Sequence, residues 1–98
     1  LRLLTVTLGA DGVAWFADGR SGRTPGFRVQ VADTTGAGDA FVAGLLAALQ
    51  ADPDLPTDPS ALDVALRRAN AYAALTTTAP GAIPALPTRE ALERFLAA

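Results

Sequence analysis

The stretch Asp33–Phe41, with the sequence DTTGAGDAF, constrains the fold of this chain more than any other. It follows Phe27–Val31, where apolar and polar residues alternate as in a strand with one solvent-exposed face, and it precedes the apolar helical run Val42–Leu49. Gly36 and Gly38 allow a tight turn, and the following helix adds unpaired N–H groups and the positive end of its dipole. The stretch therefore predicts a strand, a turn that binds an anion such as a phosphate oxygen, and an interior helix.

Asp39, at the start of this helix, is the candidate catalytic residue. A carboxylate beside an anion site repels the anion, unless the carboxylate accepts a proton from the hydroxyl group that attacks it. The pattern favours phosphoryl transfer to an alcohol, in which the turn stabilises charge on the transferred group and Asp39 is the general base. The alternative is that Asp39 only interacts with the N-terminus of its own helix, as acidic residues in a first turn do.

DTTGAGDAF resembles, at every position, the C-terminal signature of the ribokinase-like (PfkB) family of carbohydrate kinases. The resemblance implies that Asp39 is the catalytic base and that the backbone of Gly36, Ala37 and Gly38 forms the anion hole. It implies an α/β fold, the C-terminal part of a ribokinase-like three-layer α/β/α architecture. Residues 1–98 would then form the nucleotide-binding and catalytic-base portion of a kinase domain. The family's earlier portion, with the sugar-binding residues and an acidic motif that positions Mg²⁺, is absent from this sequence.

Two further segments are candidates for binding the nucleotide. The first is a strand end followed by a glycine-bracketed turn, where a phosphate or ribose could approach bare backbone, although a tight turn between two strands explains it equally well. The resemblance places this segment at the border of the ATP site, and its residues are Thr7, Leu8, Gly9, Ala10, Asp11 and Gly12. The second is Asn70, which resembles the family position that contacts the nucleotide; the alternative is an ordinary exposed Asn on a helix.

The resemblance also implies a site for a monovalent cation such as K⁺ near the anion hole. The positions that correspond to its ligands are Asp33, Thr35, Thr76, Ala79 and Gly81. The family often has a Ser shortly after this glycine, where the present chain has Ala85, and that change removes one hydroxyl ligand. The threonines at 76–78 could instead satisfy backbone groups in their own turn.

Before Asp33–Phe41, the sequence predicts a buried strand over Leu3–Leu8, a second strand over Val13–Ala17 and a loop over Ser21–Gly26. The helix after Asp39 is apolar nearly all round, which predicts an interior position, and Gly44 within it suggests a close packing contact.

After that helix, Ser60 and Asp63 approximate a capping box, so a second helix is expected from about Ala61 until the threonines at 76–78. Thr88 is the expected N-cap of a last helix, whose inward face carries Leu92, Phe95 and Leu96.

Composition excludes several classes of function. The chain has no His and no Cys, which excludes histidine triads, histidine metal sites and thiolate chemistry. It has no Lys, which excludes a P-loop, and Phe41 occupies the third glycine position of a dinucleotide-binding motif. A net charge of −2 without a basic cluster argues against nucleic acid as a partner.

Targeting and membrane signals are also missing from this sequence. The longest apolar run, Ala40–Leu49, has about half the length that a bilayer crossing requires, and no signal peptide is visible. We therefore expect no membrane partner and a cytoplasmic location. The chain begins within a strand-like run and contains no Met, so we interpret it as a piece of a longer protein.

Together with the resemblance, the residues favour an ATP-dependent kinase that phosphorylates a hydroxymethyl group of a sugar. ATP, Mg²⁺ and K⁺ are the implied cofactors, and the implied partners are the sugar and a second copy that pairs through the family's N-terminal portion. Residues 81–88 resemble fructokinase-type members most. The alternatives are a nucleotide- or sugar-binding relative that lacks catalysis, and a fragment with no activity of its own.

Overall fold

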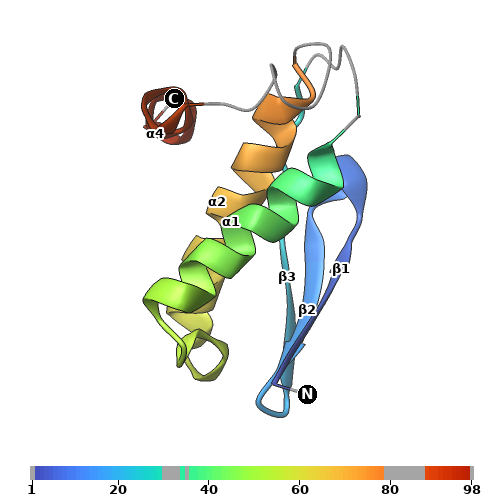
Figure 1. Cartoon of the computed structure of the whole chain (residues 1–98). Coiled ribbons are helices and arrows are strands. Elements are labelled where there is room, and N and C mark those ends of the chain that lie inside the picture. The colour runs from blue at the N-terminus through green and yellow to red at the C-terminus, as the bar shows by residue number, and fades with distance from the viewer. Residues whose placement is uncertain (1, 30–33, 35, 79–87, 98) are drawn as a thin grey trace.

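A computed structural model describes residues 2–29, 34, 36–78 and 88–97, and in it two long helices cover one face of a small sheet (Figure 1). The sheet is antiparallel, with the strand order β1-β2-β3. The elements are β1 Leu3–Thr7, β2 Val13–Ala17, β3 Arg20–Thr24, α1 Ala37–Ala51, α2 Pro59–Thr76 and α4 Arg89–Ala97, with short 3₁₀ turns at Gly9–Asp11 and Leu55–Thr57.

The second strand supplies the sheet's contribution to the core. Alternation along β2 turns Val13, Trp15 and Ala17 toward the helices, where all three are buried. Trp15 pairs with Gly22 of β3, where a Cβ would lie 2.5 Å from the indole ring, so only glycine fits beside this side chain. The strands predicted over 3–8 and 13–17 are confirmed.

The predicted loop over 21–26 is wrong for residues 21–24, because Arg20–Thr24 forms β3. Asp18 and Gly19 both have positive φ, at 52° and 72°, and Ala17 pairs directly with Arg20. This is a two-residue hairpin turn, for which Asp-Gly is a favoured sequence. Phe27–Val29, expected to be a strand, has no regular secondary structure, and the remainder of that expected strand lies outside the described residues.

The two long helices pack closely along one seam. Phe41 and Leu45 of α1 belong to the same buried cluster as Leu62 and Leu66 of α2. A Cβ on Gly44 would lie 3.3 Å from the Cα of Ala69, which confirms the close contact expected there.

Two expectations of complete burial are wrong for the described structure. On α1, Val42 and Leu46 remain 51% and 59% exposed. On β1, Leu4 and Val6 are also exposed, because α1 and α2 cover only the opposite face of the sheet (Figure 1).

The start of α2 differs from the predicted capping box. Asp58 is the N-cap, and its Oδ1 accepts hydrogen bonds from the N–H groups of Ser60 at 3.1 Å and Ala61 at 3.2 Å. The helix therefore begins at Pro59, a residue suited to the first helical position because it lacks an N–H group. Asp63 does not cap the helix. Its Oδ1 accepts a 2.7 Å hydrogen bond from the buried Thr24 hydroxyl, and this bond joins α2 to β3.

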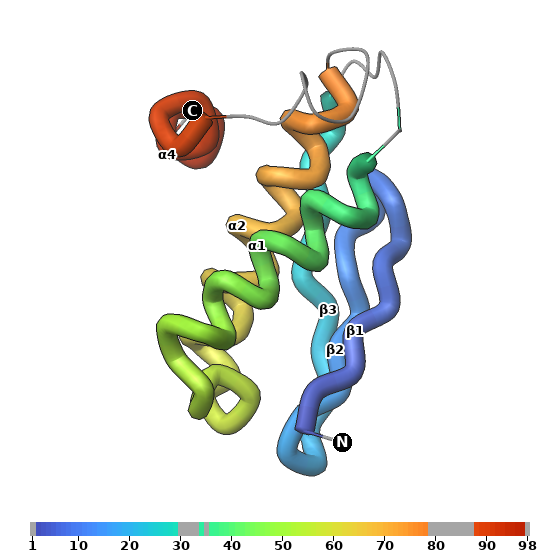
Figure 2. The backbone as a smooth tube through the Cα atoms, in the orientation of Figure 1, coloured from blue at the N-terminus to red at the C-terminus, as the bar shows by residue number. Residues whose placement is uncertain are grey.

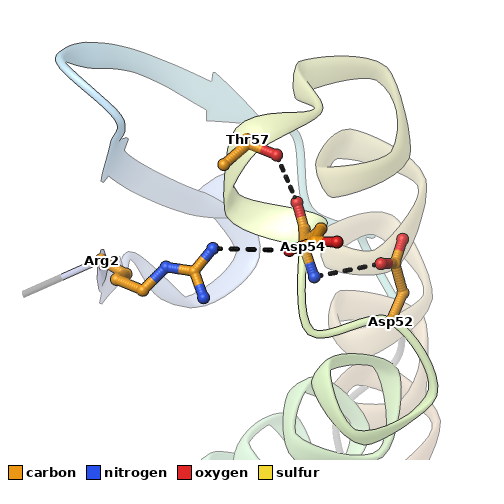
Figure 3. A network of polar contacts seen from close by, with 4 residues as sticks. All are labelled: Arg2, Asp52, Asp54 and Thr57. Atoms are coloured by element: carbon orange, nitrogen blue, oxygen red, sulfur yellow. Dashed lines mark hydrogen bonds and ion pairs between the residues drawn. The ribbon is translucent and has the colours of Figure 1, made fainter.

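A small polar network lies where β1 begins and where α1 connects to α2 (Figure 3). Arg2 Nη2 lies 3.9 Å from Asp54 Oδ1, the Asp54 N–H donates to Asp52 Oδ1 at 3.1 Å, and the Thr57 hydroxyl donates to the Asp54 carbonyl at 2.7 Å. These residues are exposed, so the ion pair contributes little stability, but the hydrogen bonds fix the path of the connection.

The last helix begins as predicted, since the Thr88 hydroxyl accepts a 3.1 Å hydrogen bond from the Ala91 N–H. Its residues Leu92, Phe95 and Leu96 are half-buried. In the part of the chain that the structure describes, no helix has the length and apolar character needed to span a membrane.

Candidate active site

The β1–β2 turn and the start of α1 meet at one end of the molecule (Figure 2). A cavity of about 360 Å³ is lined by residues of both. Segments that are distant in the sequence line this cavity. The β1–β2 turn contributes Thr7, Gly9, Ala10 and Gly12; the stretch after β3 contributes Gly26, Phe27, Arg28 and Val29; the region of the α1 N-terminus contributes Thr34, Ala37, Gly38 and Phe41; and α2 contributes Asn70, Ala73, Ala74 and Thr77.

The β1–β2 turn packs backbone against backbone on one side and is open on the other. A Cβ on Gly12, where φ is +100°, would lie 2.0 Å from the Thr24 carbonyl oxygen, and a Cβ on Gly26 would lie 2.5 Å from the Ala10 carbonyl oxygen. Gly9, with φ at +61°, would meet nothing within 4 Å. The glycines therefore have separate uses: Gly12 and Gly26 permit close packing, while Gly9 leaves backbone accessible at the cavity.

The start of α1 presents backbone N–H groups next to the cavity. Gly36 is the N-cap in the left-handed conformation, with φ at 82°, and the Ala40 N–H makes the first intrahelical hydrogen bond to the Gly36 carbonyl at 2.8 Å. The N–H groups of Gly38 and Asp39 precede that bond, so they have no acceptor within the helix. A Cβ on Gly38 would meet nothing within 4 Å, so an anion can approach without meeting a side chain.

Asp39 lies in the first turn of α1, directly after the cavity-lining Gly38. Its side chain is exposed and is not part of the cavity lining. Within the described ranges, no hydrogen bond to its carboxylate is present, including from the N–H groups of its own helix. The carboxylate is thus exposed to solvent in the first turn of α1, next to Gly38.

Asn70 is buried, with only 8% of its surface exposed, so the alternative of an ordinary surface Asn is wrong. Its Nδ2 donates a 3.2 Å hydrogen bond to the Pro25 carbonyl, and the residue lines the cavity from α2. The amide therefore joins α2 to the chain segment that forms another part of the same cavity.

The remaining predicted site residues are placed as follows. Leu8, Asp11 and Gly36 lie in the segments that form the cavity without lining it themselves. Thr76 is buried, and its hydroxyl donates to the Tyr72 carbonyl at 2.9 Å; the hydroxyls of Thr77 and Thr78 similarly donate to carbonyls in the preceding turn. The other predicted cation ligands, Asp33, Thr35, Ala79 and Gly81, lie outside the described residues, as does Ala85.

Several lining residues were missed by the sequence reading. Asn70, Ala73, Ala74 and Thr77 follow the i, i+3, i+4, i+7 spacing of one helical face, a signal that could have assigned the small residues around Asn70 to the site. Gly26 was predicted only as the last residue of a loop. Its contact with the β1–β2 turn is long-range and has no local sequence signal.

An ion pair joins two of the cavity-forming segments. Arg28 Nη2 lies 3.1 Å from Asp11 Oδ1, with both side chains largely exposed. Among residues 2–29, 34, 36–78 and 88–97, no cluster of His, Cys, Asp or Glu side chains suits a metal ion.

A comparison with protein families matches residues 1–89 to the family described as pfkB family carbohydrate kinase. The probable chloroplastic fructokinase-6 of Arabidopsis thaliana is 52% identical over 96 residues, which cover 98% of this chain and 25% of that protein.

Solved structures are similar as well. A fructokinase with bound ATP from Xylella fastidiosa superposes with a TM-score of 0.91 at 37% identity, covering 98% of this chain and 32% of that one. A fructokinase from Vibrio cholerae O395 in a form bound to fructose, ADP and calcium ion gives 0.86 at 42% identity, covering 96% and 30%. The chain thus spans about a quarter to a third of the length of these relatives.

Proposed function

This chain belongs to the pfkB family of carbohydrate kinases, and from that premise we propose that it carries the ATP site and catalytic base of a kinase for a hydroxymethyl group of a sugar. The main support for the proposal is that the start of α1 lines the cavity. At this helix start, free N–H groups and the Asp39 carboxylate are neighbours in the sequence. D-Fructose is the first candidate acceptor, because the relatives described above are fructokinases.

In the proposed reaction, Asp39 accepts the proton of the sugar hydroxyl as its oxygen attacks the γ-phosphorus of ATP. The bond from the γ-phosphorus to the β–γ bridging oxygen breaks, and ADP leaves with that oxygen. The proposed anion hole at Gly36, Ala37 and Gly38 stabilises the charge on the transferred group through the helix dipole and backbone N–H groups such as that of Gly38, while the Ala37 N–H donates to the Thr34 carbonyl at 3.2 Å. The exposed position of Asp39 supports this role, since the carboxylate is accessible to an acceptor.

The nucleotide is proposed to occupy the cavity. A volume of about 360 Å³ lies within the ~300–1,000 Å³ that is usual for small-molecule sites. Most of the lining residues are glycine, alanine and threonine, which leave room for a ring system between the β1–β2 turn and the alanine face of α2. Asn70 shapes this space through its bond to Pro25 and offers the remaining polar atoms of its amide to the ligand.

The described residues provide only some of the ligands that Mg²⁺ and K⁺ would need. Mg²⁺ would neutralise charge on the triphosphate; because the described part contains no acidic cluster, the phosphates and residues elsewhere would hold it. A K⁺ site at Asp33, Thr35, Thr76, Ala79 and Gly81 remains a proposal, to which Thr76 contributes an oxygen whose hydrogen already bonds to Tyr72. A dimer formed through the rest of the domain and a cytoplasmic location are likewise proposed, although one relative is named as chloroplastic.

The test of this function is the Asp39→Asn substitution in the intact protein that contains this chain. We expect kcat with ATP, Mg²⁺ and D-fructose to fall by at least ~10²-fold in an ADP-release assay, because the amide cannot accept the proton. ATP affinity, measured by calorimetry, should stay within about two-fold, since Asp39 does not line the cavity.

Asp18→Asn is the matched control. Asp18 is also an exposed aspartate, and its φ of 52° suits asparagine equally well, so kcat should not change. Full activity in Asp39→Asn would contradict the base assignment. Tight ATP binding without turnover of any sugar by the unmodified protein would instead favour a binding relative that lacks catalysis.

A further inference from the structure

One wall of the cavity has no regular secondary structure. Pro25–Val29 follows the end of β3 and contributes several residues to the cavity lining, but it forms neither strand nor helix. Ladder hydrogen bonds therefore do not hold this segment, which is called here the cavity wall. Its position must depend on contacts from the elements around it.

Those contacts are made by side chains from separate elements. Asn70 of α2 donates to the Pro25 carbonyl, and Arg28 pairs with Asp11 of the β1–β2 turn at 3.1 Å. The ion pair is largely exposed, so it should contribute little.

Phe27 is held by two different helices. The guanidinium carbon of Arg67 on α2 lies 5.0 Å from the centroid of the Phe27 ring, a cation–π distance. The ring of Phe95 on α4 lies 4.9 Å away, centroid to centroid, at an interplanar angle of 57°, which is a favourable tilted geometry for aromatic pairs. The half-buried Phe27 is therefore the anchor of the cavity wall.

The last helix is itself fixed to α2 near this anchor. Arg68 Nη2 donates a 2.7 Å hydrogen bond to Glu93 Oε1, and this bond together with the positive charge of Arg68 lowers the pKa of the Glu93 carboxyl. Glu93 and Phe95 lie on the same short helix, so the ring contact docks α4, and the half-exposed ion pair adds only a little. The docked helix then presents Phe95 to the cavity wall.

We propose that Phe95 and Arg67 are positioning residues for the nucleotide site, acting through Phe27, so that docking of α4 sets the ATP affinity of the enzyme. The inference rests on the proposed function, because it takes the cavity to be the ATP site. Neither residue lines the cavity, and neither touches the nucleotide in this assignment. Their effect is to hold Gly26, Phe27 and Val29 where the ligand needs them.

The experiment measures ATP affinity by calorimetry and steady-state kinetics in the intact protein. Phe95→Ala should raise both the Kd and the KM for ATP by about 3- to 10-fold, which is the effect on affinity expected from the loss of one aromatic contact. The kcat at saturating ATP should stay within about two-fold, because Asp39 and the α1 N-terminus are unchanged. Phe95→Tyr retains the ring and should restore the affinity.

Leu96→Ala is the matched control, since it truncates a half-buried side chain on the same helix without touching either aromatic contact. It should lower thermal stability as much as Phe95→Ala does and leave ATP affinity unchanged. In a Phe27→Leu background, Phe95→Ala should cause little further loss of affinity, because the residue through which it acts has been replaced.

Unchanged ATP affinity in Phe95→Ala, or an equal loss in Leu96→Ala, would overturn the positioning role. Additive losses in the Phe27→Leu background would do so too, because Phe95 would then act independently of Phe27. If the proposed function is wrong, the outcome differs from all of these, because the unmodified protein would bind no ATP.

Discussion

The glycines of the site differ in how much space a side chain would have. Gly12 and Gly26 have backbone atoms of the other segment within 3 Å of that position, so any side chain there would separate the β1–β2 turn from the cavity wall. Gly38 has nothing within 4 Å and no positive φ, so folding does not require glycine at this position. A ligand in the space in front of Gly38, as proposed for the phosphates of ATP, would account for the lack of a side chain there.

We therefore expect Gly38→Val to separate binding from folding. Stability should remain within about 1 kcal/mol of the parent, because valine has a higher helix propensity than glycine and its Cβ would meet nothing within 4 Å. ATP affinity should fall by ~10-fold or more, since the branched side chain would occupy the space in front of the free N–H groups. Thermal unfolding and calorimetry with ATP measure the two effects separately.

The control for this variant is Ala43→Val, at an exposed position farther along α1. It should leave ATP affinity unchanged and lower stability by less than about 0.7 kcal/mol, the difference in helix propensity between Ala and Val. A Gly38→Val protein that binds ATP as tightly as the parent would show that the phosphates do not lie at this helix N-terminus.

At the scale of single elements, the sequence predicted what local chemistry determines. The structure contains the predicted strands at the start of the chain and at 13–17, the helix around Asp39 and the Thr88 cap. Each has a local signal: a strand-like pattern, the helical period or a capping residue. The strand at 20–24 was not predicted, although Asp18-Gly19 is a local signal for the hairpin turn that precedes it.

Other features could not be predicted locally. Phe27–Val29 has no regular secondary structure, although its apolar residues alternate. Its contacts with Arg67 and Phe95, and the hydrogen bond from Asn70 to the adjoining Pro25, come from residues distant in the sequence, so no local pattern predicts them. For the candidate site, the sequence identified the turn, the start of α1 and Asn70, but not the cavity wall that completes it.

The start of α2 allows the two capping schemes to be compared. Asp58→Ala should lower the free energy of unfolding by about 1 kcal/mol, because the N–H groups of Ser60 and Ala61 lose their acceptor. Ser60→Ala should cost less than ~0.5 kcal/mol, since Ser60 caps nothing in the structure. Urea unfolding of both variants decides the question. A larger loss in Ser60→Ala would mean that the predicted Ser60–Asp63 capping box forms after all.

The whole molecule leaves two apolar faces uncovered by its described elements. Leu4, Val6 and Phe16 lie on the face of the sheet opposite α1 and α2, each about half exposed. Val42 and Leu46 lie on the outer side of α1. The sequence pattern of these elements is typical of α/β proteins in which both faces of the sheet are covered, whereas here only one face is.

These faces lead to a prediction for a polypeptide of residues 1–98 alone: it should self-associate and should not phosphorylate a sugar. Exposed branched and aromatic side chains on neighbouring strands form the kind of patch that a monomer rarely leaves in water. For the chemistry, the chain contains the proposed base Asp39, the proposed anion hole and the proposed ATP cavity, but it spans only about a quarter to a third of its relatives. We find no group in the described residues that would orient the acceptor hydroxyl.

Orientation of two reactants accounts for roughly 7–11 kcal/mol of a barrier, so its loss would reduce turnover below detection. The measurement is an ADP-release assay with ATP, Mg²⁺ and a panel of ketoses and pentoses, together with light scattering on the same sample. ATP binding in calorimetry would show that the cavity forms without the remainder of the domain, and it serves as the control for folding. Sugar-dependent turnover by a monodisperse monomer would contradict the prediction, because the acceptor site would then have to lie within these 98 residues.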